Sequence, residues 1–381
     1  MTGDSPARLT IEKVDSLREE LHGLFDIFSY TIDRPEAGSI TFSGAFLRDL
    51  EECYDELRNR FEEIGFTPFV RQQEERIALI AVPVVYDPPP SNWRINLVLL
   101  LLTIFSTLLV AASGEVANAA DTELGFLELY WLSVRNLWLG IPYSASILLI
   151  LGAHELGHYF AARRHKVPVT LPYFIPFPLP PFGTMGAAIR LKSPVKNRKA
   201  LFDVGSAGPL AGLVVAIPIL IIGLSTSAVE ILPDYAYSVE GNSILYWLVK
   251  LVVKGQVLPS ATQDVFLNQL AWAGWVGLFV TGLNLIPVGQ LDGGHIAYTL
   301  FGKRARRLFI PAIVVLVALI LFTGTIMWGL WVLLLLVFGR VYAEPLDDVT
   351  PLDGRRRLLA YFTLALLILV FVPIPLTFVI P

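Results

Sequence analysis

The sequence is poor in cysteine and in charge, and both shortages exclude whole classes of protein. Cys53 is the only cysteine among 381 residues, which excludes an internal disulfide framework and any zinc site built from several cysteines. Only 16% of the residues are charged, which is too few for an ordinary soluble domain of this length. The first ten residues, MTGDSPARLT, have no apolar core, so we expect no secretory signal peptide. They are also too acidic and too short for a transit peptide.

Apolar residues are abundant instead, and they gather in long runs. They make up 54% of the chain and give a mean hydropathy of +0.61. A helix needs roughly 20 apolar residues to cross a bilayer. Runs of about this length lie at residues 95–113, 141–162, 205–224, 266–288, 308–324, 326–339 and 358–380. The sequence therefore predicts a polytopic α-helical membrane protein with about seven transmembrane helices, of which the sixth is short.

Charge is distributed unevenly along the chain. Residues 1–90 carry 18 acidic and 9 basic side chains, whereas the remaining residues carry 15 and 20. Basic residues gather in 163–203 and 303–307, and loops rich in Lys and Arg stay on the cytosolic side. The acid-leaning loop 225–265 then lies outside, and alternation places the N-terminus in the cytosol. With no transit peptide, we expect the membrane to be a prokaryotic plasma membrane.

Residues 1–88 predict a small, acidic α+β soluble domain. Apolar side chains recur at helical spacing over 9–24 and 50–64. The segments SITFSG and RIALIAVPVVY are typical of strands, the second being rich in branched residues. A stiff proline-rich linker at 89–94, within YDPPPSN, follows. It leads to the membrane domain at 95–381.

One apolar run, ILLILGAHELGHYFAARR, carries ionisable residues where only lipid-compatible residues are expected. In a helix, His154 and His158 lie one turn apart on the same face, so their imidazoles can bind one metal ion. Glu155 is adjacent and can reach a water molecule on that ion. The pattern is H-E-x-x-H, which supplies two zinc ligands and a general base. A buried cluster of this kind without a metal would be costly; the alternative is a polar helix contact or a proton relay.

A catalytic zinc site needs a third protein ligand and one open position, and a later apolar run offers that ligand. In LFVTGLNLIPVGQLDGGHIAY, residues 278–298, proline and glycine break the helix, which is tolerated where the backbone lines a cavity. Asp292 falls in this break, and Gly293 and Gly294 would let its loop bend. Asp292 is therefore the predicted third ligand. His295 is the rival ligand, or else a polar residue beside the site.

Together these motifs resemble the site-2 protease family of intramembrane zinc metalloproteases. HELGH is followed by N-x-x-P-x-x-x-x-D-G, formed by Asn284, Pro287, Asp292 and Gly293. FGTMGA at 182–187 is similar to the family's membrane-associated β-loop, and FDVGSAGPLAG at 202–212 is similar to its glycine-rich third core helix. The resemblance covers a core at about 145–300. Within the family, NLIPVGQLDGG and the acidic leader are most similar to the plant ethylene-dependent gravitropism-deficient yellow-green subfamily and its prokaryotic relatives.

The resemblance implies roles for single residues. His154, His158 and Asp292 would hold zinc, and Glu155 would act as the general base. Asn284 would donate to the oxyanion or orient the peptide, and its alternative role is a cap at the helix break. The β-loop residues that would bind substrate are Gly183, Thr184, Met185 and Gly186. The chain has no room for a PDZ domain, so regulation through such a domain is not expected.

The β-loop belongs to an apolar stretch that cannot form a regular helix. LPYFIPFPLPPFGTMGAAIRL contains five prolines, which remove backbone donors and break helices. We expect residues 171–192 to form a re-entrant loop with a strand at GTMGAAIRL. An exposed strand edge could hold an unwound substrate segment by β-addition. The alternative is a plain connecting loop.

Three further features favour packing or lipid contact over chemistry. Gly208 and Gly212 form G-x-x-x-G, which permits close helix contact. Residues 245–255 predict an amphipathic surface helix. The tryptophans expected to act as interface anchors or packing residues are Trp272, Trp275, Trp328 and Trp331.

The sequence thus predicts an intramembrane zinc metallopeptidase that cleaves transmembrane segments of single-span membrane proteins, as in regulated intramembrane proteolysis. Its partners would be such a substrate and the lipid bilayer, with no nucleic acid. The alternatives are an inactive zinc-binding scaffold, a metal transporter, and a different H-E-x-x-H peptidase with a Glu as third ligand. An intact Glu155 disfavours the scaffold, and the lack of a visible internal repeat disfavours the transporter.

Overall fold

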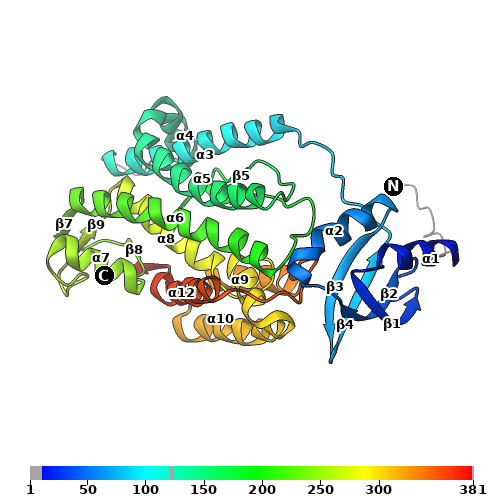
Figure 1. Cartoon of the computed structure of the whole chain (residues 1–381). Helices are drawn as coiled ribbons and strands as arrows, with labels where there is room; N and C mark the ends of the chain where they lie inside the picture. Colours follow the sequence, from blue (N-terminus) through cyan, green and yellow to red (C-terminus); the bar gives the residue numbers. More distant parts are fainter. Residues whose placement is uncertain (1–10, 121–123, 380–381) are drawn as a thin grey trace. The chain divides into compact units, whose positions relative to one another are not determined.

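The computed structural model describes residues 11–120 and 124–379, and the chain divides into two units. Unit 1 consists of residues 1–89, 192–201 and 343–354, and unit 2 consists of the rest of the chain. Figure 1 labels the helices and strands of both units. Unit 1 is discontinuous in sequence, because two of its segments come from between membrane-like runs.

The sheet of unit 1 has four antiparallel strands in the order β1–β2–β4–β3. The elements are α1 (Ile11–Glu20), β1 (Phe25–Ile32), β2 (Ile40–Phe46), α2 (Leu50–Glu63), β3 (Thr67–Gln73) and β4 (Arg76–Val82). Burial alternates along β2, where Ile40 and Phe42 are buried, as expected for a strand with one face on a core. Helix α2 contributes Tyr54, Leu57 and Phe61 to the same core. The unit thus has the α+β composition that its sequence predicts.

The sequence analysis did not predict the two edge strands of this sheet, β1 and β3. β1 buries only Phe25 among its eight residues, so it shows no apolar alternation. β3 contains Pro68, and a proline within a run argues against a strand. The first helix is shorter than predicted, because α1 ends at Glu20 and Gly23 adopts a φ of +77° in the turn that follows. The start of the predicted helical pattern, Leu9, lies outside the described residues.

The two later segments complete unit 1 through backbone and ion-pair contacts. The N–H of Val70 in β3 donates to the carbonyl of Leu346 at 2.8 Å, and Leu346 is buried in the same core. Arg198 donates to the carboxylate of Asp348 at 2.9 Å, which ties the two later segments to each other. The outer edge of β3 is thereby covered, which removes an open edge that could pair with another chain.

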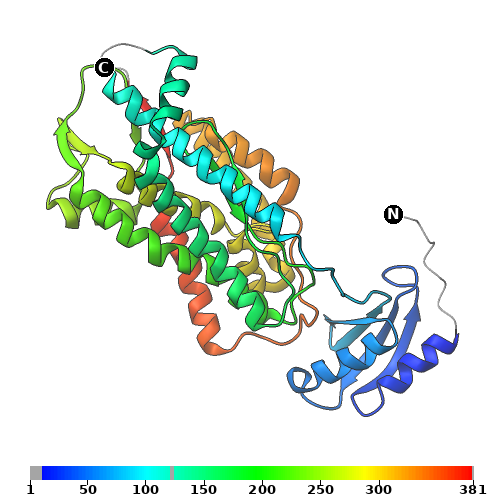
Figure 2. The same cartoon turned by 90° about the horizontal axis from the view of Figure 1, so that it is seen from above.

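Unit 2 is mainly helical, and its described part also holds three pairs of short strands. The longer helices are α3 (Trp93–Ala119), α5 (Ile141–Arg164), α6 (Arg198–Thr226, whose first turn belongs to unit 1), α8 (Gln269–Asn284), α10 (Phe309–Thr323), α11 (Met327–Phe338) and α12 (Gly354–Val370). The shorter ones are α4 (Phe126–Arg135), η1 (Leu137–Gly140), α7 (Ile244–Lys254), α9 (Asp292–Phe301) and η2 (Gly302–Leu308). The strand pairs are β5 (Tyr173–Pro176) with β6 (Thr184–Ala188), β7 (Ala228–Ile231) with β9 (Gln263–Phe266), and β8 (Tyr237–Glu240) with β10 (Leu376–Val379). In Figures 1 and 2, α3, α5 and α6 run lengthwise beside one another.

Several of these helices are suited to a membrane. The stretches of the described chain that are long and apolar enough to cross one are residues 93–119, 137–164, 198–226 and 292–323. Every predicted apolar run contains a helix, but α8, α11 and α12 have only 16, 12 and 17 residues. The last predicted run, 358–380, ends early, because α12 stops at Val370 and residues 376–379 pair with β8. The membrane character is confirmed, and the number of seven spans stays a prediction.

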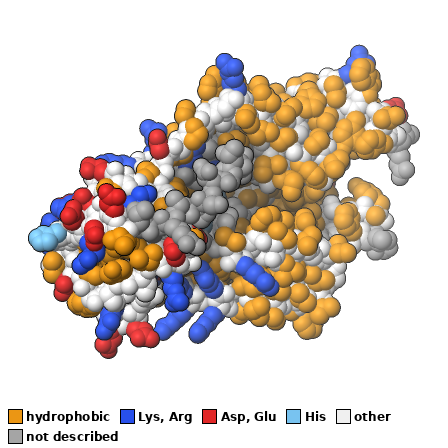
Figure 3. All heavy atoms as spheres, turned by 90° about the vertical axis from the view of Figure 1, so that its right-hand side faces the viewer, with side chains coloured by type: hydrophobic (Ala, Val, Ile, Leu, Met, Phe, Trp, Pro, Cys, Tyr) orange, Lys and Arg blue, Asp and Glu red, His pale blue; other side chains and the backbone are white. Residues whose placement is uncertain are grey.

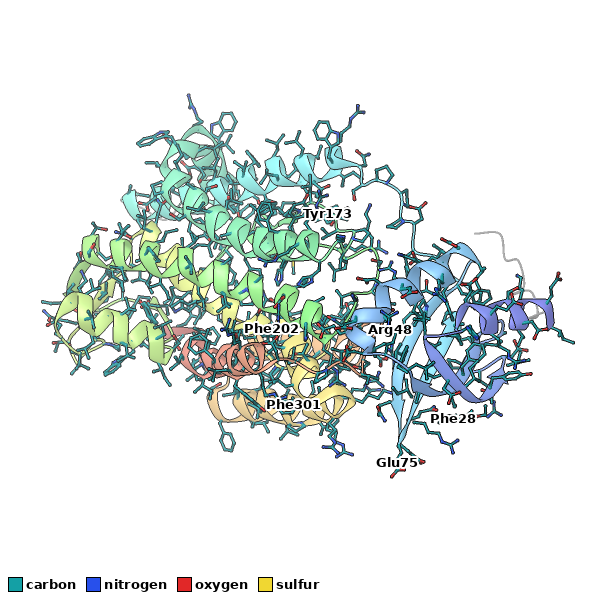
Figure 4. The ribbon with its side chains drawn as sticks, viewed as in Figure 1. Phe28, Arg48, Glu75, Tyr173, Phe202 and Phe301 are labelled. Atoms are coloured by element: carbon teal, nitrogen blue, oxygen red, sulfur yellow. The ribbon has the colours of Figure 1, made fainter. Side chains whose placement is uncertain are left out.

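The exposed surface of unit 2 is apolar, as lipid contact requires. In Figure 3, hydrophobic side chains cover most of the visible surface of unit 2. Leu101, Val314 and Leu333, from three different helices, are each more than half exposed. On unit 1 the exposed residues include charged ones such as Arg48 and Glu75, both labelled in Figure 4. Apolar exposure on this scale would mark an interface in a soluble protein; here Leu101 and Val314 belong to stretches that can span a bilayer, and Leu333 belongs to the shorter apolar helix α11.

A buried charge cluster holds together the region between α6 and α8. Lys250 on α7 is fully buried, and its ammonium lies 3.7 Å from carboxylate oxygens of both Glu240 and Asp264. The Tyr246 hydroxyl donates to Glu240 at 2.7 Å. Burial raises the pKa of Glu240 above its usual range, although the ammonium of Lys250 opposes the shift. The one charge in the middle of α7 thus points inward, and the exposed face of this predicted amphipathic helix is apolar.

The tryptophans act mainly through packing. Trp275 and Trp328 are fully buried, and their indole N–H groups donate to the carbonyls of Gly241 and Pro373, each at 2.8 Å. Trp272 stacks on Trp275 with ring centroids 4.9 Å apart. The packing role that the sequence analysis allowed is therefore the one the structure shows for Trp272, Trp275 and Trp328, and the role of Trp331 stays a prediction.

Candidate metal centre

Helix α5 carries the first three site residues. His154, Glu155 and His158 are only 5%, 5% and 7% exposed, and they continue a face that also buries Ile147. The helix forms on a continuous apolar run, and Pro142 lies in its first turn, where a missing N–H costs nothing. Because a turn takes 3.6 residues, the two histidines stack along the helix, with ring centroids 4.9 Å apart.

Asp292 meets the two histidines from the start of α9. Its two carboxylate oxygens lie 3.2 Å from Nε2 of His154 and 3.2 Å from Nε2 of His158, respectively. The two Nε2 atoms are 3.1 Å apart. The donor atoms of all three residues lie within 4.8 Å of one another, so they could hold one metal ion. Two motifs that are far apart in sequence therefore meet in one site.

The backbone at Asp292 differs from the predicted loop. Asp292 is the first residue of helix α9, and Gly293 and Gly294 are helical. A Cβ on Gly293 would overlap the carbonyl oxygen of Leu285, so this glycine permits close packing and does not bend the chain. The bend lies earlier, at Gly289, which has a φ of +60°. The prediction of a flexible Gly-Gly loop was wrong, because the sequence does not show which glycine has a positive φ.

Helix α6 passes directly behind the two histidine rings. A Cβ on Gly208 would overlap the His158 imidazole, and a Cβ on Gly212 would lie 3.2 Å from Nδ1 of His154. The two glycines are one helical turn apart, like the two histidines, so each glycine faces one ring. The G-x-x-x-G pattern does permit close helix packing, and the side chains that it brings close to α6 are the two histidines whose nitrogens could hold a metal ion.

The carbonyl of Val204 on α6 fixes the tautomer of His158. Nδ1 of His158 lies 2.7 Å from this oxygen, and a carbonyl oxygen can only accept, so Nδ1 carries the proton. Nε2 is then unprotonated and free to bind a metal. Metal-binding histidines usually donate their other ring N–H in this way, which holds the ring in place.

The donor set fits zinc. Two imidazole nitrogens and one carboxylate oxygen form the three-ligand set of a catalytic zinc site, which keeps one position open. The buried donors lie close together with no protein cation among them, a costly arrangement that a divalent cation resolves. The rival ligand His295 lies outside the group whose donor atoms converge. Its Cβ packs against Gly205, and its Nδ1 has no hydrogen-bond partner among the described residues.

Glu155 and Asn284 border the converging donors. An Oε1 atom of Glu155 lies 4.0 Å from Nε2 of His154, beside the donor set but outside it. Asn284 is the last residue of α8, and its Nδ2 lies 3.5 Å from the same Nε2 atom. The site therefore has a carboxylate and a carboxamide beside the three converging donors.

Strands β5 and β6 form a hairpin where the re-entrant loop is predicted. Tyr173, labelled in Figure 4, begins β5, a strand that escapes the sequence analysis because prolines surround it. β5 packs against α3, and no strand of the described chain pairs with the other edge of β6. Directly after β6, the backbone N–H of Ile189 lies near the carboxylate of Glu155. A free strand edge therefore lies beside Glu155.

The four predicted substrate-binding residues differ in what they contact. Gly183 has a φ of +72°, and its carbonyl accepts from the Ser106 hydroxyl of α3 at 2.6 Å. The Thr184 hydroxyl donates within the hairpin and is buried. Met185 is 61% exposed, and no atom lies within 4 Å of the position that a Gly186 Cβ would take. The first two residues thus anchor the hairpin, and the last two offer surface to a second chain.

Sequence reasoning missed the polar contacts that hold the site helices. The Tyr143 hydroxyl of α5 donates to the carbonyl of Phe182 in the hairpin at 2.7 Å. Asp203 on α6 accepts two hydrogen bonds of 2.8 Å from Arg356 on α12, and it lies 2.8 Å from Nε2 of His165 at the end of α5. The only sign of these contacts in the sequence was the presence of a polar residue within an apolar run or at its end.

Comparisons with known proteins show similarity to zinc metalloproteases. The model of peptidase family M50 matches residues 142–326. A probable zinc metalloprotease EGY2, chloroplastic, of Arabidopsis thaliana is 30% identical, and the match covers 98% of this chain and 67% of the relative. The EGY2 protein of Oryza sativa subsp. indica is 27% identical over 98% of this chain and 68% of its own length. EGY1 of Arabidopsis thaliana is 31% identical over 76% of this chain and 55% of its own length. No solved structure matches this chain.

Proposed function

Since the chain belongs to peptidase family M50 and is a zinc-dependent metalloprotease, we propose that it cleaves peptide bonds within transmembrane segments of single-span membrane proteins. One observation carries the proposal: the converging donors and Glu155 lie in α5 and α9, inside stretches that are long and apolar enough to span a membrane. A substrate bond must then reach the site within the membrane. Cleavage of such segments is the reaction of regulated intramembrane proteolysis.

His154, His158 and Asp292 would hold the zinc ion. Bound zinc supplies a Lewis acid that makes water nucleophilic near neutral pH and polarises a carbonyl group. The hydrogen bond from His158 Nδ1 to the Val204 carbonyl, 2.7 Å long, keeps Nε2 aimed at the ion.

Glu155 would move the proton. Its carboxylate takes the proton from the attacking water and then gives it to the leaving amine, a role worth typically 10²- to 10⁴-fold in rate. The backbone N–H of Ile189 lies near this carboxylate and would favour its ionised form. An inactive scaffold would not need a carboxylate beside the metal and outside the donor set, which favours an enzyme over that alternative.

Asn284 would stabilise the developing negative charge. Its Nδ2 is a donor that lies 3.5 Å from a zinc-binding nitrogen, so it can reach an oxygen of a peptide placed at the metal. Donors fixed before the reaction begins stabilise an oxyanion at little reorganisation cost, and removal of one such donor costs about 10²- to 10³-fold in rate.

The free edge of β6 would hold the substrate. The backbone amides of a transmembrane helix are bonded within the helix, so the scissile region must unwind before attack. An unwound segment can pair with an open strand edge, and β6 offers such an edge and ends one residue before Ile189, which lies near Glu155. This pairing would satisfy the amides that unwinding exposes.

We also propose that the N-terminal domain lies in the cytosol of an integral membrane protein. The relatives named above are chloroplastic, and the prokaryotic plasma membrane stays a prediction from the sequence. Cys53 is buried, so the native thiol should stay silent to maleimide reagents. Arg164→Cys and Tyr235→Cys introduce exposed thiols, and we expect an impermeant reagent to label them from opposite sides. Labelling from the same side would refute this topology.

The replacement Glu155→Gln tests the catalytic proposal. Glutamine keeps the shape of the side chain but removes its basicity, so we expect cleavage to be lost while zinc content and thermal stability stay near wild type. The assay is a panel of purified single-span helices incubated with each protein, with and without a chelator. Cleavage by the variant at close to the wild-type rate would refute the mechanism, and loss of zinc would show that Glu155 is a ligand.

A further inference from the structure

A pocket separate from the metal centre opens where α3 ends and α5 begins. Its volume is about 410 Å³, and its apolar walls include Val110 of α3, Leu129 of α4 and Trp272 of α8. A pocket of this volume can take a small molecule or a long side chain. It is not purely apolar, because Glu115 of α3 also lines it.

Glu115 brings a carboxylate without a counter-charge into the pocket. The residue is half-buried, and its Oε1 accepts a hydrogen bond from Nε2 of Gln269 at 2.7 Å. Its second oxygen has no hydrogen bond or ion pair with the described residues, and it is not one of their buried unpartnered atoms, so it can meet a ligand. No Lys, Arg or His of the described chain lines the pocket.

The contacts around Glu115 fix its position but do not account for its charge. The carboxamide of Gln269 also donates to the Leu139 carbonyl at 2.8 Å and accepts from the N–H of Tyr143 at 3.0 Å, so it is held firmly. A glutamine at position 115 could accept the same bond from Gln269. Glu115 also lies four residues before the end of α3, where the helix dipole disfavours an anion. An ionisable residue at such a place in an apolar span usually marks function, and a carboxylate favours a cationic ligand.

The pocket lies at one end of the strand edge proposed for the substrate. The Tyr143 hydroxyl of α5 donates to the carbonyl of Phe182 at 2.7 Å, and residues 180–181, directly before it, line the pocket. At the other end of β6, Ile189 lies near Glu155. Because α5 also contacts β6, both elements lead from the pocket to Glu155.

The length of α5 indicates which part of a substrate would reach the pocket. Glu155 follows Tyr143 by twelve residues of helix, which corresponds to about 18 Å along the axis. An extended chain covers about 3.3 Å per residue. A segment paired with β6 would therefore cover this distance in about five or six residues.

We propose that this pocket binds a basic side chain of the substrate, Lys or Arg, about five or six residues from the cleaved bond. The apolar walls suit the methylene stem of such a side chain, and Glu115 meets its charged head. A lipid ammonium group carries the same charge, but the continuity of the pocket with the hairpin favours a chain that is already held along β6. The proposal rests on the proposed function and adds a charge requirement to its substrate.

The test compares cleavage of helices that differ at one position. A single-span helix that the wild type cleaves carries either Lys or uncharged norleucine, placed in turn at each position flanking the cleaved bond. We expect Lys to raise kcat/KM about 10- to 100-fold at one position, the effect of a hydrogen bond between charged groups. In Glu115→Gln this ratio should fall to near one. Glu128→Gln removes an exposed carboxylate of α4 that does not line the pocket, so it should keep the wild-type ratio.

A binding measurement separates this proposal from the proposed function. A single-span helix with photoactivatable lysine at successive positions, or with its acetylated form, is mixed with the Glu155→Gln protein in phosphatidylglycerol nanodiscs. We expect the lysine form to label peptides from residues 110–118 or 267–272 in preference to the acetylated form. This labelling without any cleavage by the wild type would overturn the proposed function alone.

Three outcomes would overturn the proposal itself. One is cleavage by the wild type with no preference for Lys at any position. Another is equal labelling by the lysine and acetylated forms. The third is labelling of the pocket by photoactivatable phosphatidylethanolamine with none by the helices, which would assign the pocket to a lipid.

Discussion

The replacement Gly208→Ala tests whether α6 sets the space for the zinc-binding side chains. The added methyl group would lie 2.5 Å from Cε1 of His158, and closer still to Nε2. Ordinary contact of a Cβ begins at 3.4 Å, so the ring or the helix must move by about 1 Å. The ring is not free to turn away, because its Nδ1 is bound to the Val204 carbonyl at 2.7 Å.

A displacement of about 1 Å is large enough to decide whether Gly208→Ala weakens or strengthens zinc binding. Metal–ligand distances are held within about 0.2 Å, and loss of a contact that orients a ligand costs typically 10- to 100-fold in metal affinity. We therefore expect Gly208→Ala to weaken zinc binding by at least that factor. Helix propensity alone predicts the opposite, since alanine is better than glycine by about 0.5–1 kcal/mol inside a helix. The steric effect should therefore appear as a loss of zinc and of activity, whereas the stability of helix α6 itself should not fall.

The assay compares zinc per chain and chelator competition for two alanine variants. Gly152→Ala is the matched control, because Gly152 lies in α5 two residues before His154 and no atom lies within 4 Å of its would-be Cβ. This control should keep its zinc and its activity. If Gly208→Ala retained zinc as tightly as Gly152→Ala, the argument that α6 limits the space behind the rings would be refuted.

Two further predictions concern the metal and the buried charges. Asp292→Ala should lose its zinc in elemental analysis while His295→Ala keeps it, and undiminished zinc in the first variant would make His295 the ligand. Lys250→Met leaves two carboxylates buried without their cation, which typically costs about 3–5 kcal/mol, measured by denaturant unfolding in detergent. Burial already raises the pKa of Glu240 above its unfolded value, so the protonated form favours the folded state, and the variant should regain stability as the pH is lowered. Stability of the variant that does not change with pH would contradict this reasoning.

The residues of the candidate metal site could be predicted because their arrangement follows from spacing along a helix and from the rarity of ionisable residues in apolar runs. Two histidines four residues apart share a helix face whatever the rest of the fold does. Asp292 was found because ionisable residues are rare within apolar runs, where each needs a reason. Membership of a helix and spacing along it are properties that a sequence shows directly.

The features that were not predictable depend on distant contacts. The sequence shows that Gly208 and Gly212 permit close packing, but it does not show that histidine rings fill the space. The segment of β5 has too many prolines for a strand to be predicted. It nevertheless pairs with β6 and packs against helix α3. The segment 343–354 is short and polar. It lies beside β3 because its backbone pairs with that strand, which comes more than 200 residues earlier in the chain. A single sequence carries no record of such pairings.

Helix α6 orders the site without giving the metal a ligand. Its Val204 carbonyl orients one histidine, and its glycines leave room for both rings. A shift of α6 by one residue, which combines a slide of about 1.5 Å along its axis with a rotation of about 100°, would place a side chain where a glycine must be. We therefore expect metal binding to depend on the register of α6 against α5 as well as on the ligands. Asp203, one residue before Val204, is hydrogen-bonded to both His165, which caps the end of α5, and Arg356 of α12, and these contacts link the three helices at this end.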